Sequence, residues 1–245
     1  MGNDQSRGTN EDTIDRFVSN RTVQNRVIER ALRLVERPRF LPMTAHVSAP
    51  FAMYPARYDA REFNEGPLRV SSMDVYAQVL DYLRIRRGMT VLNVGTGSGF
   101  LSTVLGVLLG DFGTNHGVEI FPNLIKYANN NVIRWVKRKV STTVGFAKPV
   151  FRLADILDPD FWRAHAEVYD RIYVSFVITN RNAFNRILRM LKVGGILVAP
   201  SQEQMCRYTR VSQNEVVCEF MGRVNFATQV IIPPEDRPPV PQFDR

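Results

Sequence analysis

The sequence is poor in the features that mark secreted, membrane-spanning and metal-binding proteins. Only two cysteines occur in 245 residues, too few for a disulfide framework or a cysteine zinc site, and they fit a reducing compartment. No uncharged apolar run reaches the roughly 18 residues that a membrane-spanning helix needs. The N-terminal segment has no apolar core of the kind found in secretory signals. We therefore expect a cytoplasmic protein without a metal site.

The composition and charge indicate one folded, basic domain. The chain is 44% hydrophobic and 23% charged, which is enough to bury a substantial core. Its net charge is +8, and arginines crowd residues 16–39. A basic surface attracts nucleic acid or an anionic membrane, but no interleaved aromatic platform accompanies these arginines. Because a solvated helix face explains them better, we expect no nucleic-acid partner.

The first residues match a lipidation pattern. Gly2 follows the initiator and Ser6 stands at the required position for N-myristoylation. A chance match in a disordered polar tail, which we expect over residues 1–12, is the alternative. A single myristoyl chain would give only reversible contact with a membrane surface.

Periodicity and turn residues predict the order of the elements. An amphipathic N-terminal helix is expected at 22–36, ended by Pro38, followed by an irregular Pro-rich loop at 37–70 and a helix at 73–83. Short buried strands then alternate with helices. The expected strands are 90–95, 115–120, 149–155, 169–176 and 194–200, and the helices are 100–109, 122–137 and 182–191.

This alternation predicts an α/β fold with a doubly wound, largely parallel sheet. Antiparallel strands at 204–212 and 216–226 are expected to close the sheet. The predicted domain therefore spans residues 13–232, and residues 233–245 form a Pro-rich tail.

The stretch "VLNVGTGSGF" places three glycines after the first strand of that sheet. Ligands of doubly wound sheets bind at the carboxyl ends of the strands, and glycines let backbone amides approach a ligand closely. The spacing differs from the dinucleotide fingerprint, because Phe100 stands at the last glycine position, and no Lys-Ser/Thr pair of a P-loop follows. The pattern resembles the first motif of Rossmann-like S-adenosylmethionine-dependent methyltransferases. The predicted cofactor-binding residues in this loop are Gly95, Thr96, Gly97, Ser98 and Gly99.

Two acids follow at the ends of the next two strands. Glu119 ends the second strand, where a carboxylate can accept hydrogen bonds from both ribose hydroxyls. Asp155 ends the third strand and could meet an adenine amine. The alternatives are a surface residue for Glu119 and a helix N-cap for Asp155.

Longer stretches resemble the protein-L-isoaspartate O-methyltransferases over roughly residues 12–232. The similar stretches are "LRVSSMDVYAQVLDYLRIRRGMTVLNVGTGSGFLSTVLGVLLG", "NHGVEIFPNLIKYANNNV", "YDRIYVSF" and "LKVGGILVAP". The resemblance is greatest to the branch of isoaspartate O-methyltransferase domain-containing proteins, and the N-terminal "MG" with Ser6 supports it. The family methylates the free carboxylate of isoaspartyl residues with S-adenosylmethionine, which initiates protein repair. A monomer that acts on isoaspartyl proteins or peptides is therefore expected.

The same branch implies an alternative function. Its members are thought to act as adaptors that bring substrates to a ubiquitin ligase. A domain that binds the cofactor with little turnover, and recognises isoaspartyl proteins for ligase components, is thus the rival of the repair enzyme. A methyltransferase with another acceptor is a third reading.

The substrate motif of the family is altered in this chain. Ser71 aligns with the serine whose hydroxyl contacts the reacting carboxylate, which makes it the candidate catalytic residue. Ser72 and Met73 replace the Ala-Pro that follows, and Asp74 stands where many members have histidine. A carboxylate there would repel a carboxylate substrate by ~1 to 4 kcal/mol, depending on the local dielectric. Alternatively, Ser71 and Asp74 form a capping box at the start of the helix.

Three further departures concern the surroundings of the site. The stretch "HVSAP" at 46–50 matches the family motif better but lies too far upstream, so Ser48 is expected to be a loop residue. Ser175 and Phe176 replace small residues after the fourth strand and could narrow the site. Asn93 stands where many methyltransferases carry an acid. The domain-containing branch also has asparagine at this position.

Overall fold

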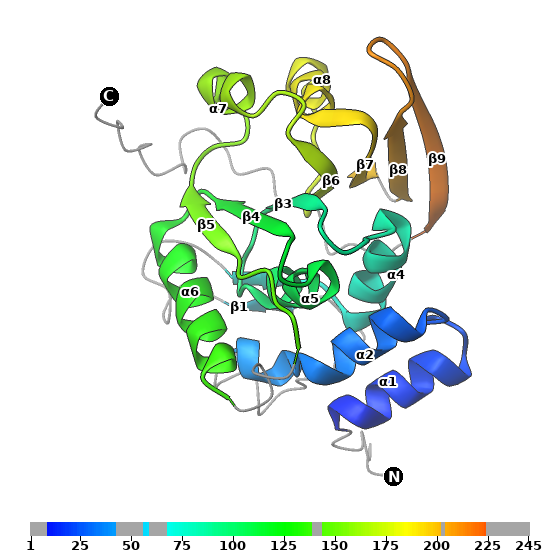
Figure 1. Cartoon of the computed structure of the whole chain (residues 1–245), viewed down its shortest axis with the longest axis vertical. Coiled ribbons are helices and arrows are strands. Elements are labelled where there is room, and N and C mark those ends of the chain that lie inside the picture. Colours follow the sequence, from blue (N-terminus) through cyan, green and yellow to red (C-terminus); the bar gives the residue numbers. More distant parts are fainter. Residues whose placement is uncertain (1–8, 43–55, 59–67, 139–143, 202–203, 224–245) are drawn as a thin grey trace.

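The fold is a three-layer α/β structure with helices on both faces of a central sheet (Figure 1). The computed structural model describes residues 9–42, 56–58, 68–138, 144–201 and 204–223. Gly2 and Ser6, the HVSAP stretch at 46–50 with Ser48, and the Pro-rich tail at 233–245 lie outside the described residues. No helix in the described part of the chain is long and apolar enough to span a bilayer.

The central sheet has seven strands in the order β5-β4-β3-β6-β7-β8-β9. The first five are mutually parallel, and β8 and β9 are antiparallel additions after β7. The bounds are β3 Thr90–Val94, β4 Thr114–Glu119, β5 Val150–Leu153, β6 Tyr169–Val174, β7 Leu191–Ser201, β8 Gln204–Arg210 and β9 Val216–Arg223. The predicted doubly wound, largely parallel sheet with antiparallel C-terminal strands is therefore confirmed. The strand order reverses between β3 and β6, which is where such folds bind ligands.

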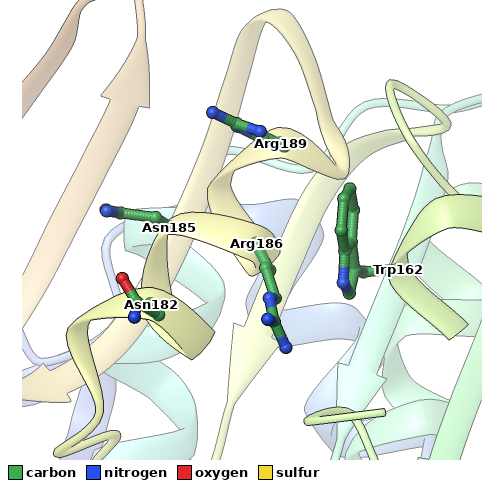
Figure 2. Close-up of a pocket in the computed structure, with 5 residues that line it drawn as sticks. All are labelled: Trp162, Asn182, Asn185, Arg186 and Arg189. Carbon is green, nitrogen blue, oxygen red and sulfur yellow. The ribbon is translucent and has the colours of Figure 1, made fainter. Parts of the chain in front are cut away.

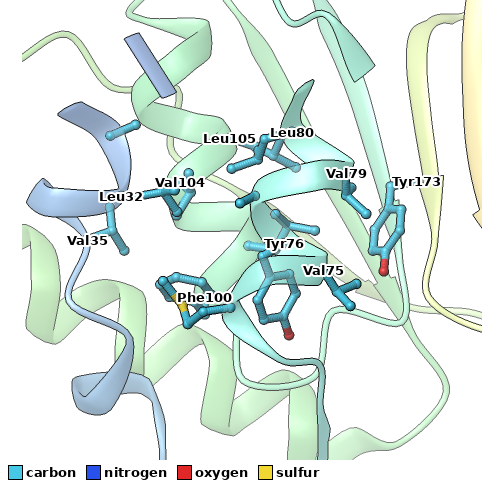
Figure 3. Packing of buried hydrophobic residues seen from close by; sticks show 14 of the residues in the cluster. Leu32, Val35, Val75, Tyr76, Val79, Leu80, Phe100, Val104, Leu105 and Tyr173 are labelled. Atoms are coloured by element: carbon cyan, nitrogen blue, oxygen red, sulfur yellow. The ribbon is translucent and has the colours of Figure 1, made fainter. Parts of the chain in front are cut away.

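Helices cover the two faces unequally (Figure 1). One face packs on α1, α2, α4, α5 and α6, and the opposite face on α7 and α8. The bounds are α1 Asn10–Ser19, α2 Arg26–Leu34, α4 Met73–Leu83, α5 Phe100–Leu109, α6 Pro122–Val136, α7 Pro159–Ala164 and α8 Arg181–Arg189. Figure 3 shows Leu32, Leu80 and Leu105 from α2, α4 and α5 meeting in the larger core. Helix α5 is apolar on nearly every side because it is buried by its neighbours on all sides.

The N-terminal region differs from the sequence prediction. Helix α1 begins at Asn10, so the last three residues of the predicted tail at 1–12 are helical. A capping box starts α1: the Asp12 amide donates to the Thr9 hydroxyl, and the Asp12 carboxylate accepts from the Thr9 amide. The helix predicted at 22–36 is shorter, because Asn25 caps α2 and Val35 ends it.

The segment predicted as irregular, 37–70, contains short regular elements. The 3-10 helix η1 spans Arg37–Phe40, and β1 Ala56–Tyr58 pairs antiparallel with β2 Leu68–Val70. The prediction of an irregular loop is therefore wrong for these residues. Downstream, helix α7 was not predicted because its six residues are too few to show a helical period.

Gly106 in α5 offers a test of this packing. Alanine normally stabilises a helix interior relative to glycine by about 1 kcal/mol. A methyl group on Gly106 would instead lie 2.6 Å from the Ala147 carbonyl oxygen and 2.5 Å from the Phe146 ring. We expect Gly106→Ala to lower the free energy of unfolding by about 1–3 kcal/mol, measured by urea denaturation. A Gly106→Ala variant more stable than the wild type would contradict the packing of Phe146 and Ala147 on α5.

Candidate active site

The glycine loop after β3 is compressed between two neighbouring segments. The amides of Gly95 and Thr96 both donate to the Val118 carbonyl, at 2.9 and 3.3 Å. A methyl group on Gly95 would lie 2.2 Å from Ser175 Oγ, so the loop also touches the segment that follows β6. Gly95, Gly97 and Gly99 all have positive φ, which a side chain would strain. The loop therefore keeps its path only with these glycines.

Glu119 ties the loop to the end of β4. Its Oε2 accepts from the Gly97 amide at 3.1 Å, and its Oε1 accepts from the Ile120 amide at 2.9 Å. The side chain is only 8% exposed. Burial raises the pKa of the Glu119 carboxyl, and the backbone hydrogen bonds oppose that rise in part. The surface-residue alternative for Glu119 is wrong, because this acid is buried at the carboxyl edge of the sheet.

Two polar side chains at the end of β3 keep unused hydrogen-bonding capacity. The Thr96 hydroxyl is buried and has no hydrogen-bond partner among the described residues. The Asn93 amide donates to Ser102 Oγ at 2.8 Å, which leaves its Oδ1 buried without a described partner. Buried polar atoms in native structures are normally paired. A polar ligand over this loop would give the Thr96 hydroxyl a partner.

Asp155 lies at the same edge, one strand further out. The amide of Ala154 donates to the Glu119 carbonyl at 3.1 Å, so the turn after β5 begins beside Glu119. Asp155 Oδ1 accepts from the Leu157 amide at 2.8 Å and so closes its own turn. The N-cap of α7 is Asp158, which makes the N-cap alternative for Asp155 wrong.

Ser71 precedes α4 and is fixed through its backbone. Its amide donates to the Tyr76 hydroxyl at 3.2 Å, and its carbonyl accepts from the Arg37 guanidinium at 2.9 Å. The alternative of a capping box formed by Ser71 and Asp74 is wrong, because Ser72 is the N-cap and no side-chain hydrogen bond caps the helix. Asp74 Oδ1 is buried without a hydrogen-bond partner among the described residues.

Residues 69–71, which lead into α4 and which we name the Ser71 segment, lie against the glycine loop. A methyl group on Gly97 would lie 3.4 Å from the Arg69 carbonyl oxygen, two residues before Ser71. Phe100, which follows the loop, packs edge-on against Tyr76 with ring centroids 5.3 Å apart. The predicted residues of the glycine loop, Glu119, Asp155 and Ser71 thus all lie at the carboxyl edge around β3.

Three residues of this region escaped the sequence prediction. Arg37 falls in the segment expected to be irregular, Tyr76 reads as an ordinary core position of α4, and Tyr173 as a core position of β6. All three are buried, and no local spacing signals their convergence on Ser71.

A pocket lies away from these residues, in the hollow between α7 and α8 (Figure 2). Its volume is about 220 Å³, and the Arg186 guanidinium carbon lies 5.8 Å from the Trp162 ring centroid. The lining residues are Trp162, Asn182, Asn185, Arg186 and Arg189. None of the predicted site residues is among them, so the candidate site remains the edge around β3.

Comparisons with known proteins identify the family to which the chain is similar. The family model described as protein-L-isoaspartate(D-aspartate) O-methyltransferase matches residues 8–231. A protein-L-isoaspartate O-methyltransferase of Caenorhabditis elegans is 30% identical over 52% of this chain and 52% of its own length. One of Methanothrix thermoacetophila is 33% identical over 50% of this chain and 55% of its own. The chain therefore spans about half the length of the curated relatives it matches.

A solved structure shares the fold over most of the chain. It is described as a protein-L-isoaspartate O-methyltransferase of Plasmodium falciparum in complex with S-adenosyl-L-homocysteine. The TM-score is 0.69 at 14% identity, and the alignment covers 91% of this chain and 98% of that one. At this identity the likeness establishes the fold.

The contact between Gly95 and Ser175 can be tested with a pair of variants. We expect Gly95→Ala to lower the free energy of unfolding by about 1–3 kcal/mol from overpacking and about 1–2 kcal/mol from the left-handed backbone. Adding Ser175→Ala removes the oxygen that the new methyl group would meet and should restore the overpacking part. Urea denaturation of both variants measures this. A double variant no more stable than Gly95→Ala would contradict the contact.

Proposed function

The chain belongs to the protein-L-isoaspartate(D-aspartate) O-methyltransferase family, and from that premise we propose that it methylates the free carboxylate of isoaspartyl residues in damaged proteins. The observation that carries the proposal is the meeting of three features at one edge. The glycine loop, the buried acid Glu119 and the Ser71 segment adjoin where the strand order reverses. This is where a doubly wound sheet binds its ligand.

The residues at this edge fit S-adenosylmethionine. Glu119 is an acceptor-only group when ionised and suits a ligand that presents ribose hydroxyls. The unpartnered Thr96 hydroxyl and the positive-φ glycines leave polar backbone and side-chain groups for the ligand. The residues proposed to hold the cofactor are Gly95, Thr96, Gly97, Ser98, Gly99, Glu119 and Asp155.

The chemistry demands positioning more than proton transfer. When bound, S-adenosylmethionine supplies an activated methyl group. An isoaspartyl carboxyl has an ordinary pKa of about 3.5 to 4 and is already ionised at neutral pH, so no general base is required. The role proposed for Ser71 is to donate a hydrogen bond that holds the carboxylate in line with the methyl group.

Asp74 bears on whether a carboxylate substrate is tolerated. It lies in the first turn of α4, where the helix dipole favours a negative charge. The positive end of that dipole offsets part of the repulsion that Asp74 would exert on a second carboxylate. We therefore propose that turnover survives this substitution.

Methyl transfer from labelled S-adenosylmethionine to an isoaspartyl peptide, with its aspartyl twin as control, tests the proposal. We expect transfer to the isoaspartyl peptide alone. Ser71→Ala should lower kcat/KM roughly tenfold to a hundredfold, since a hydrogen bond to a charged group contributes about 1.5–3 kcal/mol. Cofactor affinity should stay within about twofold.

Ser72→Ala is the matched control for that variant. Its hydroxyl is adjacent in the chain and makes no capping bond, so activity should not change. Cofactor binding without transfer to either peptide would overturn the repair function and favour the adaptor for a ubiquitin ligase.

Membrane attachment through Gly2 stays a prediction, because Gly2 lies outside the described residues. A ligase partner and the monomeric state stay predictions too.

The buried carboxyl of Glu119 predicts a pH dependence of cofactor binding. Burial raises the pKa of this carboxyl above its usual value. Only the ionised form leaves both oxygens as acceptors, so affinity is full above the raised pKa and falls as pH drops through it. The decline should therefore begin at a higher pH than for an exposed glutamate.

Calorimetric titration with S-adenosyl-L-homocysteine between pH 4.5 and 8 measures this. Glu119→Gln should weaken binding at pH 7 by about tenfold to a hundredfold and flatten the pH dependence. Glu215→Gln, at an exposed turn position, should leave both unchanged. A wild-type affinity that is constant over this range would contradict the role of Glu119.

A further inference from the structure

Three buried side chains from distant parts of the chain converge on Ser71. Arg37 comes from η1, Tyr76 from α4 and Tyr173 from β6, and we name these three the Ser71 clamp. Figure 3 shows Tyr76 and Tyr173 in the core with their hydroxyls directed to the same side. Both tyrosines are interior residues, and Tyr173 is only 1% exposed.

Two members of the clamp fix the backbone of Ser71. The Arg37 guanidinium donates to its carbonyl at 2.9 Å, and its amide donates to the Tyr76 hydroxyl at 3.2 Å. Arg37 is only 1% exposed, so this donor is held within the protein rather than in solvent. With both backbone groups of Ser71 bound, the position of its Cα is fixed, and only the rotations about its Cα–Cβ and Cβ–Oγ bonds still direct the hydroxyl.

The third member, Tyr173, makes no hydrogen bond to the backbone of Ser71. The Tyr173 hydroxyl is buried and makes no hydrogen bond of normal geometry to any described residue. The Ser71 side chain is nevertheless close enough for a hydrogen-bonding contact that lowers the pKa of Tyr173 in part. Burial raises that pKa, so the phenol stays protonated and remains a donor at physiological pH. A buried donor without a partner is costly, and native structures keep such groups for a reason.

We propose that Tyr173 is a positioning residue that donates its hydroxyl hydrogen to Ser71 Oγ while Ser71 donates its own to the substrate carboxylate. A serine hydroxyl has one hydrogen and two lone pairs. Once its hydrogen is directed at the carboxylate, a lone pair is free to accept from Tyr173. Successive hydrogen bonds of this kind polarise and strengthen one another. The inference rests on the proposed function, because it needs Ser71 to contact the substrate.

A purely structural role for Tyr173 makes the opposite prediction. If the phenol only fills the core, phenylalanine should replace it with no loss of function. Removing an unpartnered buried hydroxyl should leave stability unchanged or raise it. A positioning role predicts that Tyr173→Phe weakens substrate binding while the stability of the protein is unchanged or higher. Stability and substrate affinity therefore distinguish the two roles.

A double-variant cycle tests the coupling. In the wild-type background, Tyr173→Phe should raise KM for an isoaspartyl peptide about two- to tenfold, the range expected for one hydrogen bond. Affinity for S-adenosyl-L-homocysteine and the melting temperature should not fall. In the Ser71→Ala background the same change should have no further effect, because Tyr173 acts through Ser71.

Tyr169→Phe is the matched control, since it makes the same change on the same strand. The Tyr169 hydroxyl contacts His116 Nδ1 at 3.1 Å, and its ring packs in the core on the opposite face of the sheet. Its KM should equal that of the wild type. An unchanged KM in Tyr173→Phe, or effects of the two variants that simply add, would overturn the inference. A wild type that neither binds nor methylates the isoaspartyl peptide would overturn the proposed function and the inference with it.

Discussion

The buried carboxylate of Glu119 is the interaction on which the site depends. It accepts from the amide of Gly97 and from that of Ile120, and so joins the glycine loop to the end of β4. The loop reaches Glu119 only because glycines with positive φ let it turn between Val118 and Ser175. A buried ionisable group of this kind is costly to desolvate. Its backbone hydrogen bonds offset part of that cost, and a hydroxyl-bearing ligand would offset more.

The parallel strands make this arrangement possible at a distance. Residues far apart in the sequence end neighbouring strands, so their side chains meet at one edge without any loop having to bring them there. The Ser71 segment precedes α4 in the chain and packs on the glycine loop through the Arg69 carbonyl. The larger core then fixes both, because Phe100 contacts Tyr76 on one side and Phe40 on the other.

The strand-helix alternation was predictable from the sequence because buried strands and amphipathic helices leave different periods. The location of the glycine loop, Glu119 and Asp155 at one edge of the sheet was predictable too, because each comes at the carboxyl end of a strand. Local signals failed where tertiary contacts decide. Ser71 and Asp74 match a capping box, yet the backbone of Ser71 is bound elsewhere and Ser72 becomes the cap. Helix α1 was missed although Thr9 and Asp12 carry its cap. The convergence of Arg37 and Tyr173 on Ser71 has no local signature at all.

A titration with S-adenosyl-L-homocysteine, followed through the amide chemical shifts, would locate the cofactor site on the protein. We expect the largest shifts at Gly95, Gly97 and Gly99, with the Gly97 amide most affected because its hydrogen bond to Glu119 lies at the centre of the site. Residues of the hollow between α7 and α8, such as Asn182, should not shift. Shifts confined to that hollow, or no shifts at saturating ligand, would contradict the assignment of the cofactor site to the edge around β3.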